Sequence, residues 1–193
     1  MSHKIAVLVS GRGSNLQSII DATRDGRLDA TIAIVISNRE DAAALNRAKD
    51  AGIETACVSP SRLPDRDSCD HAMVDLLRSR DVELVCLAGY MQPVRRPMLE
   101  AFPDRILNIH PSLLPAFPGL HAQQQALEHG VKVAGVTVHV VTAKIDAGPI
   151  LAQACVPVLP GDTVDTLSAR ILVEEHRIYP ETIARVLLKR TSM

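Results

Sequence analysis

The chain has 193 residues, of which 47% are apolar and 22% are charged, and its formal net charge is −1. The apolar content excludes a disordered chain, and the near-neutral charge with only 2% aromatic residues argues against nucleic-acid binding, which needs basic patches or stacking rings. The longest apolar runs are far shorter than the roughly 20 residues of a membrane span. The four cysteines form no C-x-x-C pair, so we expect reduced thiols, a cytoplasmic protein and no metal.

The first 110 residues alternate short apolar runs with helical patterns. Strands are predicted over residues 4–9, 31–37, 53–58, 83–88 and 105–109, with helices between the first four. Ser14 is the predicted N-cap of the first helix, and Gly26 is its predicted end. Repeated strand–helix alternation indicates a parallel sheet with helices on both faces.

The second half of the chain follows a different pattern. Three prolines within residues 110–119 exclude a regular element there, and a long irregular stretch in a compact domain is usually functional. A short helix is predicted over 122–129, strands over 134–142 and 150–156, and a final helix from about 164 that Pro180 kinks or splits. The fold expected is therefore α/β, an open, mostly parallel twisted sheet of about seven strands in a single domain spanning residues 1–193.

The first motif is Gly11-Arg-Gly-Ser-Asn15, which separates the first strand from the first helix. Glycines permit a tight turn, and a helix N-terminus offers free amides, so the motif predicts a phosphate site. It is not a P-loop, and Leu16 replaces the third glycine of the dinucleotide fingerprint. A tight turn with a capped helix and no ligand remains the alternative.

The second and third motifs place polar side chains near one sheet edge. Asn108 and His110 are two positions apart in a strand, so their side chains should share one face. Asp146 lies in a Gly-Pro loop between the last two strands, where it would orient or charge His110. The alternatives are a structural strand end and ordinary turn chemistry for the aspartate.

Other histidines rank lower as functional residues. His139 alternates with valines in a strand, which favours packing or a supporting role, while His121 and His176 are possible residues of the site rim. No nucleophile elbow and no zinc helix motif occur. Acid–base and electrostatic catalysis are therefore favoured over covalent or metal mechanisms.

Together these motifs resemble the phosphoribosylglycinamide formyltransferases, the folate-dependent transformylases of purine synthesis. The resemblance covers nearly the whole chain and lies in Val9-Ser-Gly-Arg-Gly-Ser-Asn15, Ala88-Gly-Tyr-Met91, Asn108-Ile-His-Pro-Ser-Leu-Leu-Pro115, Phe117-Pro-Gly119 and Asp146-Ala-Gly-Pro149. Methionyl-tRNA formyltransferases and formyltetrahydrofolate hydrolases share the Asn108 block, which therefore specifies the chemistry more firmly than the acceptor. The glycine loop and the lack of a further domain select the glycinamide ribonucleotide enzymes.

The resemblance implies a Rossmann-like formyltransferase fold and a formyl transfer from 10-formyltetrahydrofolate, the co-substrate, to glycinamide ribonucleotide without a metal. It implies small-molecule partners and a monomer or homodimer. It assigns catalysis to Asn108, His110 and Asp146, ribonucleotide binding to Gly13, Ser14, Asn15 and Glu175, and folate binding to Arg66, Leu87, Met91, Gln92, Pro93, Val94, Asn108, Val141, Thr142 and Asp146. Because the chain has few rings, backbone groups and an aliphatic slot would hold the pterin.

One position departs from the family's pattern. Many relatives have Arg after the Met of the 91–94 turn, whereas Gln92 and Pro93 follow Met91 here. Two other functions remain as alternatives: a formyltetrahydrofolate hydrolase that uses water as the nucleophile, and a non-catalytic nucleotide-binding module.

Overall fold

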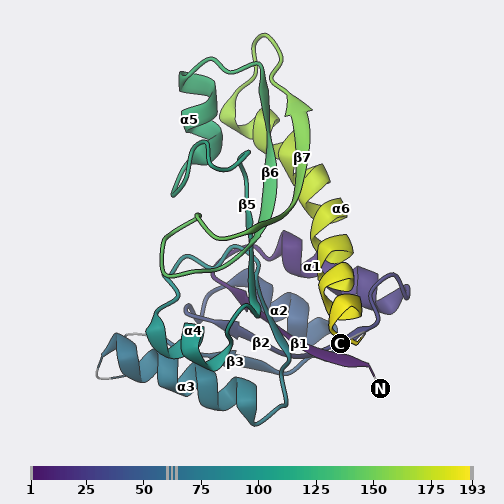
Figure 1. The fold of residues 1–193 in the computed structure, drawn as a ribbon, viewed down its shortest axis with the longest axis vertical. Helices are drawn as coiled ribbons and strands as arrows, with labels where there is room; N and C mark the ends of the chain where they lie inside the picture. The colour runs from purple at the N-terminus through teal and green to yellow at the C-terminus, as the bar shows by residue number, and fades with distance from the viewer. Residues whose placement is uncertain (1, 60, 62, 64, 192–193) are drawn as a thin grey trace.

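The computed structural model describes residues 2–59, 61, 63 and 65–191. Its centre is one open sheet of seven strands in the order β3-β2-β1-β4-β5-β6-β7 (Figure 1). The strands are β1 (His3–Val9), β2 (Ala30–Ser37), β3 (Thr55–Cys57), β4 (Leu84–Leu87), β5 (Ile106–His110), β6 (Val133–Val140) and β7 (Ile150–Pro157). All neighbours from β3 to β5 are parallel, and β6 and β7 are antiparallel to their neighbours. The predicted mostly parallel sheet is confirmed.

Helices cover both faces of the sheet, as the strand–helix alternation predicts. They are α1 (Ser14–Arg24), α2 (Ala43–Asp50), α3 (Arg66–Arg78), α4 (Arg96–Ala101), α5 (Ala122–Glu128) and α6 (Val164–Thr191). Alternate residues of β1 divide between two buried clusters: Ile5, Val7 and Val9 pack on the face of α1, α2 and α6, and Ala6 and Leu8 pack on the face of α3 and α4. This division follows from the two-residue period of a strand.

At three places the structure differs from the prediction or narrows it. The N-cap of α1 is Gly13, in the left-handed conformation with φ of 78°, and no side chain caps the helix, so Ser14 is instead its first residue. α4 was missed because six residues are too few to display a helical period, although Pro97 near its start is a helix-opening signal. α6 continues through Pro180 as one helix of 28 residues and is not split.

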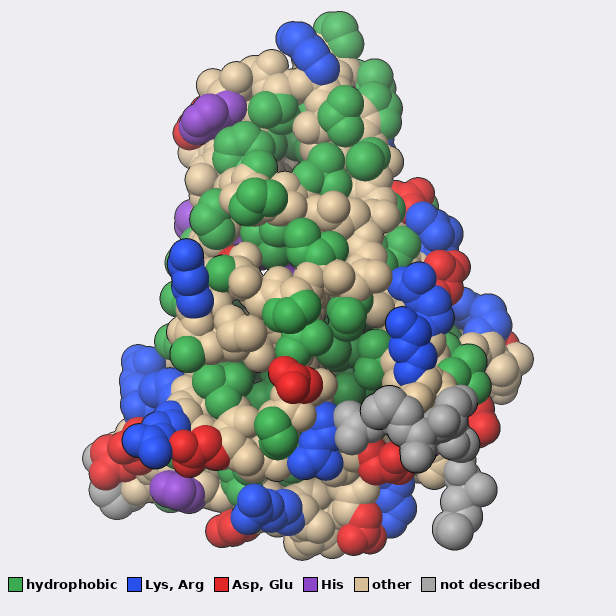
Figure 2. All heavy atoms as spheres, in the orientation of Figure 1, with side chains coloured by type: hydrophobic (Ala, Val, Ile, Leu, Met, Phe, Trp, Pro, Cys, Tyr) green, Lys and Arg blue, Asp and Glu red, His purple; other side chains and the backbone are tan. Residues whose placement is uncertain are grey.

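The molecular surface carries charges of both signs. Lys and Arg side chains are interspersed with Asp and Glu over the lower part of the face drawn in Figure 2, and the region above them is largely uncharged. This face therefore presents no extended patch of one sign. No helix in the described part of the chain combines the length and the apolar content that crossing a membrane requires.

Candidate active site

The carboxyl end of β5 presents two polar side chains beside the antiparallel strand β6. In the sheet register, Asn108 pairs with His139 and His110 pairs with Thr137. The Asn108 Nδ2 lies 3.2 Å from the Nε2 of His139, whose Nδ1 lies 3.0 Å from the carbonyl of Val140. His139, predicted to pack or to support the site, thus contacts one of the predicted catalytic residues directly.

Asp146 approaches this strand end from the loop between β6 and β7. Its Oδ2 lies 3.5 Å from His110 Nδ1, and its Oδ1 lies 3.5 Å from both Asn108 Nδ2 and His139 Nε2. The backbone of Asp146 has φ of 49°, an uncommon conformation for a residue with a side chain. Asn108 and His110, the other two residues predicted to be catalytic, and His139 therefore converge on the Asp146 carboxylate, although Asp146 is 38 residues from Asn108 in the sequence.

The Asp146 side chain is largely buried, at 10% exposure, yet its pKa is lowered and not raised. Burial alone would raise the pKa of its carboxyl, but a contact with His139, a hydrogen bond from the Gly119 amide and the charges of His110 and His139 outweigh that effect. The pKa of Asp146 is therefore held below its ordinary value. An ionised carboxylate at this position can stabilise a cationic imidazole or accept a proton from a reacting amine.

The imidazole of His110 lies between two acceptors. Its Nε2 is 2.9 Å from the carbonyl of Phe117, and its Nδ1 faces Asp146. A carbonyl oxygen only accepts, so Nε2 carries a proton, and a protonated ring can donate to both partners at once. His110 is also 6% exposed, which leaves its orientation to these contacts and to packing.

The Pro-rich stretch after β5 is fixed by a buried threonine and an exposed glutamine, neither of which the sequence analysis identified. Thr137 Oγ1 donates to the Ser112 carbonyl at 2.7 Å and accepts from the Leu114 amide at 3.0 Å. Gln153 Nε2 donates to the Leu114 carbonyl at 2.9 Å and to Thr137 at 3.0 Å. The alternation of Thr137 with valines in a strand was the available signal, because a polar residue on a buried face needs partners. These contacts hold the stretch that supplies the Phe117 carbonyl.

The predicted phosphate residues lie at the N-terminus of α1. Gly13 is packed so closely that an added Cβ would lie 2.6 Å from the Cβ of Ala44. Asn15 Nδ2 donates to Glu175 Oε2 of α6 at 2.6 Å, whereas Asn15 Oδ1 is buried with no hydrogen-bond partner among the described residues. Burial raises the pKa of Glu175, and the hydrogen bond from Asn15 opposes that shift only in part. The predicted ribonucleotide residues therefore form one contiguous group.

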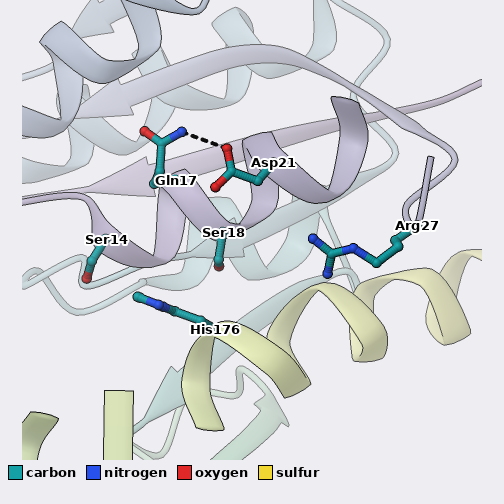
Figure 3. Close-up of a pocket in the computed structure, with 6 residues that line it drawn as sticks. All are labelled: Ser14, Gln17, Ser18, Asp21, Arg27 and His176. Atoms are coloured by element: carbon teal, nitrogen blue, oxygen red, sulfur yellow. Dashed lines mark hydrogen bonds between the residues drawn. The ribbon is translucent and has the colours of Figure 1, made fainter. Parts of the chain in front are cut away.

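A cavity of about 210 Å³ lies next to this group, between α1 and α6 (Figure 3). Its lining is polar and consists of Ser14, Gln17, Ser18, Asp21, Arg27 and His176. His176, predicted as a possible rim residue, has a buried Nε2 without a partner among the described residues, and burial lowers its pKa. The cavity contains none of the three residues that converge on Asp146, so it borders the phosphate loop rather than the predicted catalytic residues.

The predicted folate residues are distributed over three segments. Leu87, at the end of β4, is the register neighbour of Asn108, and its carbonyl accepts from Tyr179 at 2.9 Å. Arg66 opens α3 and shares a hollow with Gln92 and Pro93 of the turn after β4. Two further residues of that turn differ in exposure, since Met91 is 60% exposed and Val94 is half-buried.

Two predicted folate residues lie in the loop after β6. The amide of Val141 donates to the Ile106 carbonyl at 2.8 Å and so continues the sheet beyond its last assigned residue. Thr142 Oγ1 donates to the Lys144 carbonyl at 3.1 Å within the loop that carries Asp146. The amide of Val141 is therefore not free for a ligand. Within the described residues, no three His, Cys, Asp or Glu side chains are grouped so as to hold a metal ion.

Comparison with known proteins agrees with this arrangement. Residues 3–183 match the formyl transferase family. The chain is 43% identical over 180 residues to the phosphoribosylglycinamide formyltransferase of Escherichia coli, covering 93% of this chain and 85% of that one. It is 46% identical over 183 residues to the human trifunctional purine biosynthetic protein adenosine-3, covering 95% of this chain but only 18% of that protein.

A solved structure gives the same result. The glycinamide ribonucleotide transformylase 1 of Symbiobacterium toebii superimposes with a TM-score of 0.93 at 61% identity, covering 95% of this chain and 86% of that one. Sequence identity this high over nearly the full length shows a shared family and not only a shared fold. The chain therefore belongs to the phosphoribosylglycinamide formyltransferases, within the formyl transferase family.

Proposed function

We propose that this protein transfers the formyl group of 10-formyltetrahydrofolate to the amine of glycinamide ribonucleotide, a step of de novo purine biosynthesis. The observation that carries the proposal is the Asp146 carboxylate, which lies 3.5 Å from both Asn108 Nδ2 and His110 Nδ1 at the carboxyl end of β5. Ligands of open α/β sheets bind at this edge. None of the four cysteines, all of which the structure describes, forms a disulfide, which fits the reducing conditions of the cytoplasm, where we place the enzyme.

The ribonucleotide would bind at the N-terminus of α1. The amides of Gly13, Ser14 and Asn15 would bind its phosphate, which is favoured there by the positive end of the helix dipole. Glu175 and the unpartnered Asn15 Oδ1 would accept hydrogen bonds from the ribose hydroxyls. A ligand hydroxyl at this position would satisfy an acceptor that the described protein atoms leave unsatisfied.

The folate would bind on the other side of Asn108. Its pterin would lie between Leu87, the 91–94 turn and the backbone of the loop that begins at Val141 and Thr142 and ends at Asp146. Arg66 would contact the outer part of the molecule, since it is exposed at the start of α3. An aliphatic slot suits this chain because Tyr90, the aromatic residue of the turn, directs its hydroxyl toward the Met73 sulfur, 3.5 Å away.

Formyl transfer needs a hydrogen-bond donor to the formyl oxygen and a base that accepts the amine proton. The amine forms a bond to the formyl carbon, negative charge develops on the formyl oxygen, and the bond to the folate nitrogen then breaks, with a proton going to that nitrogen. Asn108 and protonated His110 would donate to the oxygen, an interaction typically worth about 10²–10³ in rate per donor. Ionised Asp146 would keep His110 charged and receive the amine proton, directly or through water.

The position of the Phe117 carbonyl adds a condition to this mechanism. Because His110 Nε2 now donates to that carbonyl at 2.9 Å, it must exchange this partner for the formyl oxygen when the substrates bind. Catalytic hydrogen bonds commonly reach their working geometry only in the substrate complex. The two bound substrates would then react as a positioned pair, which supplies the rest of the acceleration.

One assay tests the proposal against the two alternatives. The purified protein is supplied with 10-formyltetrahydrofolate in the presence and absence of glycinamide ribonucleotide, and tetrahydrofolate release is followed. Release only with the ribonucleotide supports the transferase. Release without it would indicate a hydrolase, and no release in either case would indicate a binding module.

A further inference from the structure

The turn between β4 and α4 is anchored at its near end by a buried hydroxyl. The amide of Met91 donates to Ser10 Oγ at 2.8 Å, and that hydroxyl donates to Asn38 Oδ1 at 2.5 Å. Ser10 and Asn38 are both buried, at 5% and 9% exposure, and they follow β1 and β2. The first residue of the predicted folate turn is thus fixed to the central strands of the sheet.

The far end of the same turn is anchored by a charge. Arg95, the residue before α4, places its Nε 3.0 Å from Asp70 Oδ2 and its Nη1 3.0 Å from Asp67 Oδ1. The Asp70 side chain is 6% exposed, whereas that of Asp67 is 71% exposed. Burial raises the pKa of Asp70, and the Arg95 guanidinium opposes that shift. Asp70 Oδ2 is buried without a hydrogen bond among the described residues, so it depends on the charge of the Arg95 guanidinium 3.0 Å away more than the exposed Asp67 does.

This ion pair joins two parts of the proposed folate site. Asp70 lies one turn into α3, the helix that Arg66 opens, and Arg95 directly follows Val94. Arg66, Asp70, Gln92, Pro93 and Arg95 line one hollow. Gln92 and Pro93 carry no charge, so neither residue can form an ion pair with the folate that would orient the turn. Its placement relative to Arg66 depends on the anchors.

We propose that Asp70 and Arg95 are positioning residues that hold the 91–94 turn at the distance from Arg66 which the folate requires. The proposal rests on the function proposed above, and it assigns to this pair a role in binding the folate but not the ribonucleotide. The guanidinium fork is needed because its two nitrogens contact two carboxylates of the same helix. A lysine at position 95 would supply one point charge and could contact only one of them.

The test compares variants of the full-length protein. Asp70→Asn removes the buried charge while keeping the shape, and Arg95→Lys keeps the charge while removing the fork. Arg96→Gln is the matched control, because Arg96 is adjacent and forms an exposed pair with Glu100 at 2.6 Å. Asp67→Asn removes only the exposed carboxylate, so it tests how much the second contact of the Arg95 fork contributes. For each variant we would measure KM for both substrates, kcat, the urea midpoint and calorimetric binding of tetrahydrofolate.

The expected result is a selective effect on folate. Asp70→Asn should raise KM for 10-formyltetrahydrofolate and weaken tetrahydrofolate binding about tenfold, as expected for loss of a charged contact, with KM for the ribonucleotide changed less than about twofold. Arg95→Lys and Asp67→Asn should each give a smaller shift in the same direction, and the Arg96→Gln control should remain near the parent. An equal rise in both KM values, or a lower urea midpoint with unchanged KM values, would show a merely structural pair and overturn the inference.

Direct binding separates this inference from the proposed function. If the parent shows no formyl transfer but binds tetrahydrofolate, and Asp70→Asn loses that binding, the positioning role stands and the proposed reaction fails. If the parent transfers the formyl group and Asp70→Asn binds tetrahydrofolate normally, the reaction stands and the positioning role fails. A parent that neither reacts nor binds tetrahydrofolate would overturn both.

Discussion

The backbone amide of Gly119 donates to the Oδ2 of Asp146 at 2.8 Å, and this bond joins the irregular stretch after β5 to the loop between β6 and β7. The same oxygen lies 3.5 Å from His110 Nδ1. The other oxygen of the carboxylate lies 3.5 Å from both Asn108 and His139. Both oxygens are therefore oriented by the protein, so a change at Asp146 alters its charge and the contacts of its neighbours together.

Replacement of Asp146 by Asn should reduce kcat by at least about a hundredfold, the usual scale for a positioned acid–base group. The amide cannot accept the amine proton, and it no longer stabilises a cationic His110. KM for glycinamide ribonucleotide should stay nearly unchanged, since the contacts that the structure describes for Asp146 are made with the strand end and Gly119, not with the Asn15–Glu175 group. Steady-state kinetics with both substrates provides the measurement.

Asp165→Asn serves as the control for the Asp146 variant, because that carboxylate lies exposed in the first turn of α6. It should leave kcat and both KM values at the parent level. Loss of ribonucleotide binding in Asp146→Asn with kcat retained would contradict the catalytic role and indicate a binding residue instead.

The sequence predicted the part of the site that depends on local periodicity. Asn108 and His110 are two positions apart in a strand, and the pleat alone places both side chains on the side where they meet Asp146. The alternation of strands and helices likewise predicted the parallel sheet, because few other architectures bury such a pattern. These features need no knowledge of distant contacts.

The remaining features depend on tertiary contacts that no local pattern encodes. Asp146 reaches the strand end only because its loop folds back with a positive φ, and its amide partner, Gly119, comes from another loop. Helix capping at Gly13 instead of Ser14 follows from the close approach of Ala44, a residue of a different helix. Thr137 reaches the backbone of Ser112 and Leu114 only because β6 pairs with β5 in this antiparallel register.

Gly13→Ala should impair ribonucleotide binding and stability together. Its Cβ would lie 2.6 Å from Ala44 Cβ and 2.8 Å from Ala44 Cα, and the φ of 78° is unfavourable for alanine. The loop must shift, and its amides would leave their positions around the phosphate. We expect KM for the ribonucleotide to rise at least about tenfold, the effect of losing one good hydrogen bond to a charged group, with KM for the folate little changed.

Gly11→Ala is the matched control within the same loop. A Cβ there would meet nothing within 4 Å, and Gly11 does not have a positive φ in the left-handed region. Kinetics and urea unfolding should therefore resemble the parent. If both alanine variants weakened ribonucleotide binding equally, the close packing at Gly13 would not be the cause.

Glu175→Gln should stabilise the folded protein at neutral pH while weakening ribonucleotide binding. Burial raises the pKa of Glu175 above its ordinary value of 4.5. Between the ordinary and the raised pKa, the unfolded chain loses this proton before the folded protein does, so a rise in pH lowers the stability of the folded state. At lower pH the carboxyl is protonated in both states, and this loss of stability is absent. The gain in urea midpoint should thus appear at pH 7 and shrink toward pH 4. A gain of equal size at both pH values would exclude ionisation of Glu175 as its origin.

Thr137→Val should destabilise the protein and slow catalysis through the loop that supplies the Phe117 carbonyl and the Gly119 amide. Valine has the same shape but leaves the Leu114 amide, now bonded to Thr137 Oγ1 at 3.0 Å, without its acceptor. An unsatisfied buried group costs roughly 1–3 kcal/mol, so the free energy of unfolding should fall by about that amount. Displacement of the Phe117 carbonyl and the Gly119 amide should also lower kcat.

Thr182→Val, at a buried threonine of α6, is the control and should leave kcat unchanged. A destabilised Thr137→Val enzyme with parental kcat would show that the loop reaches its working position without this hydroxyl.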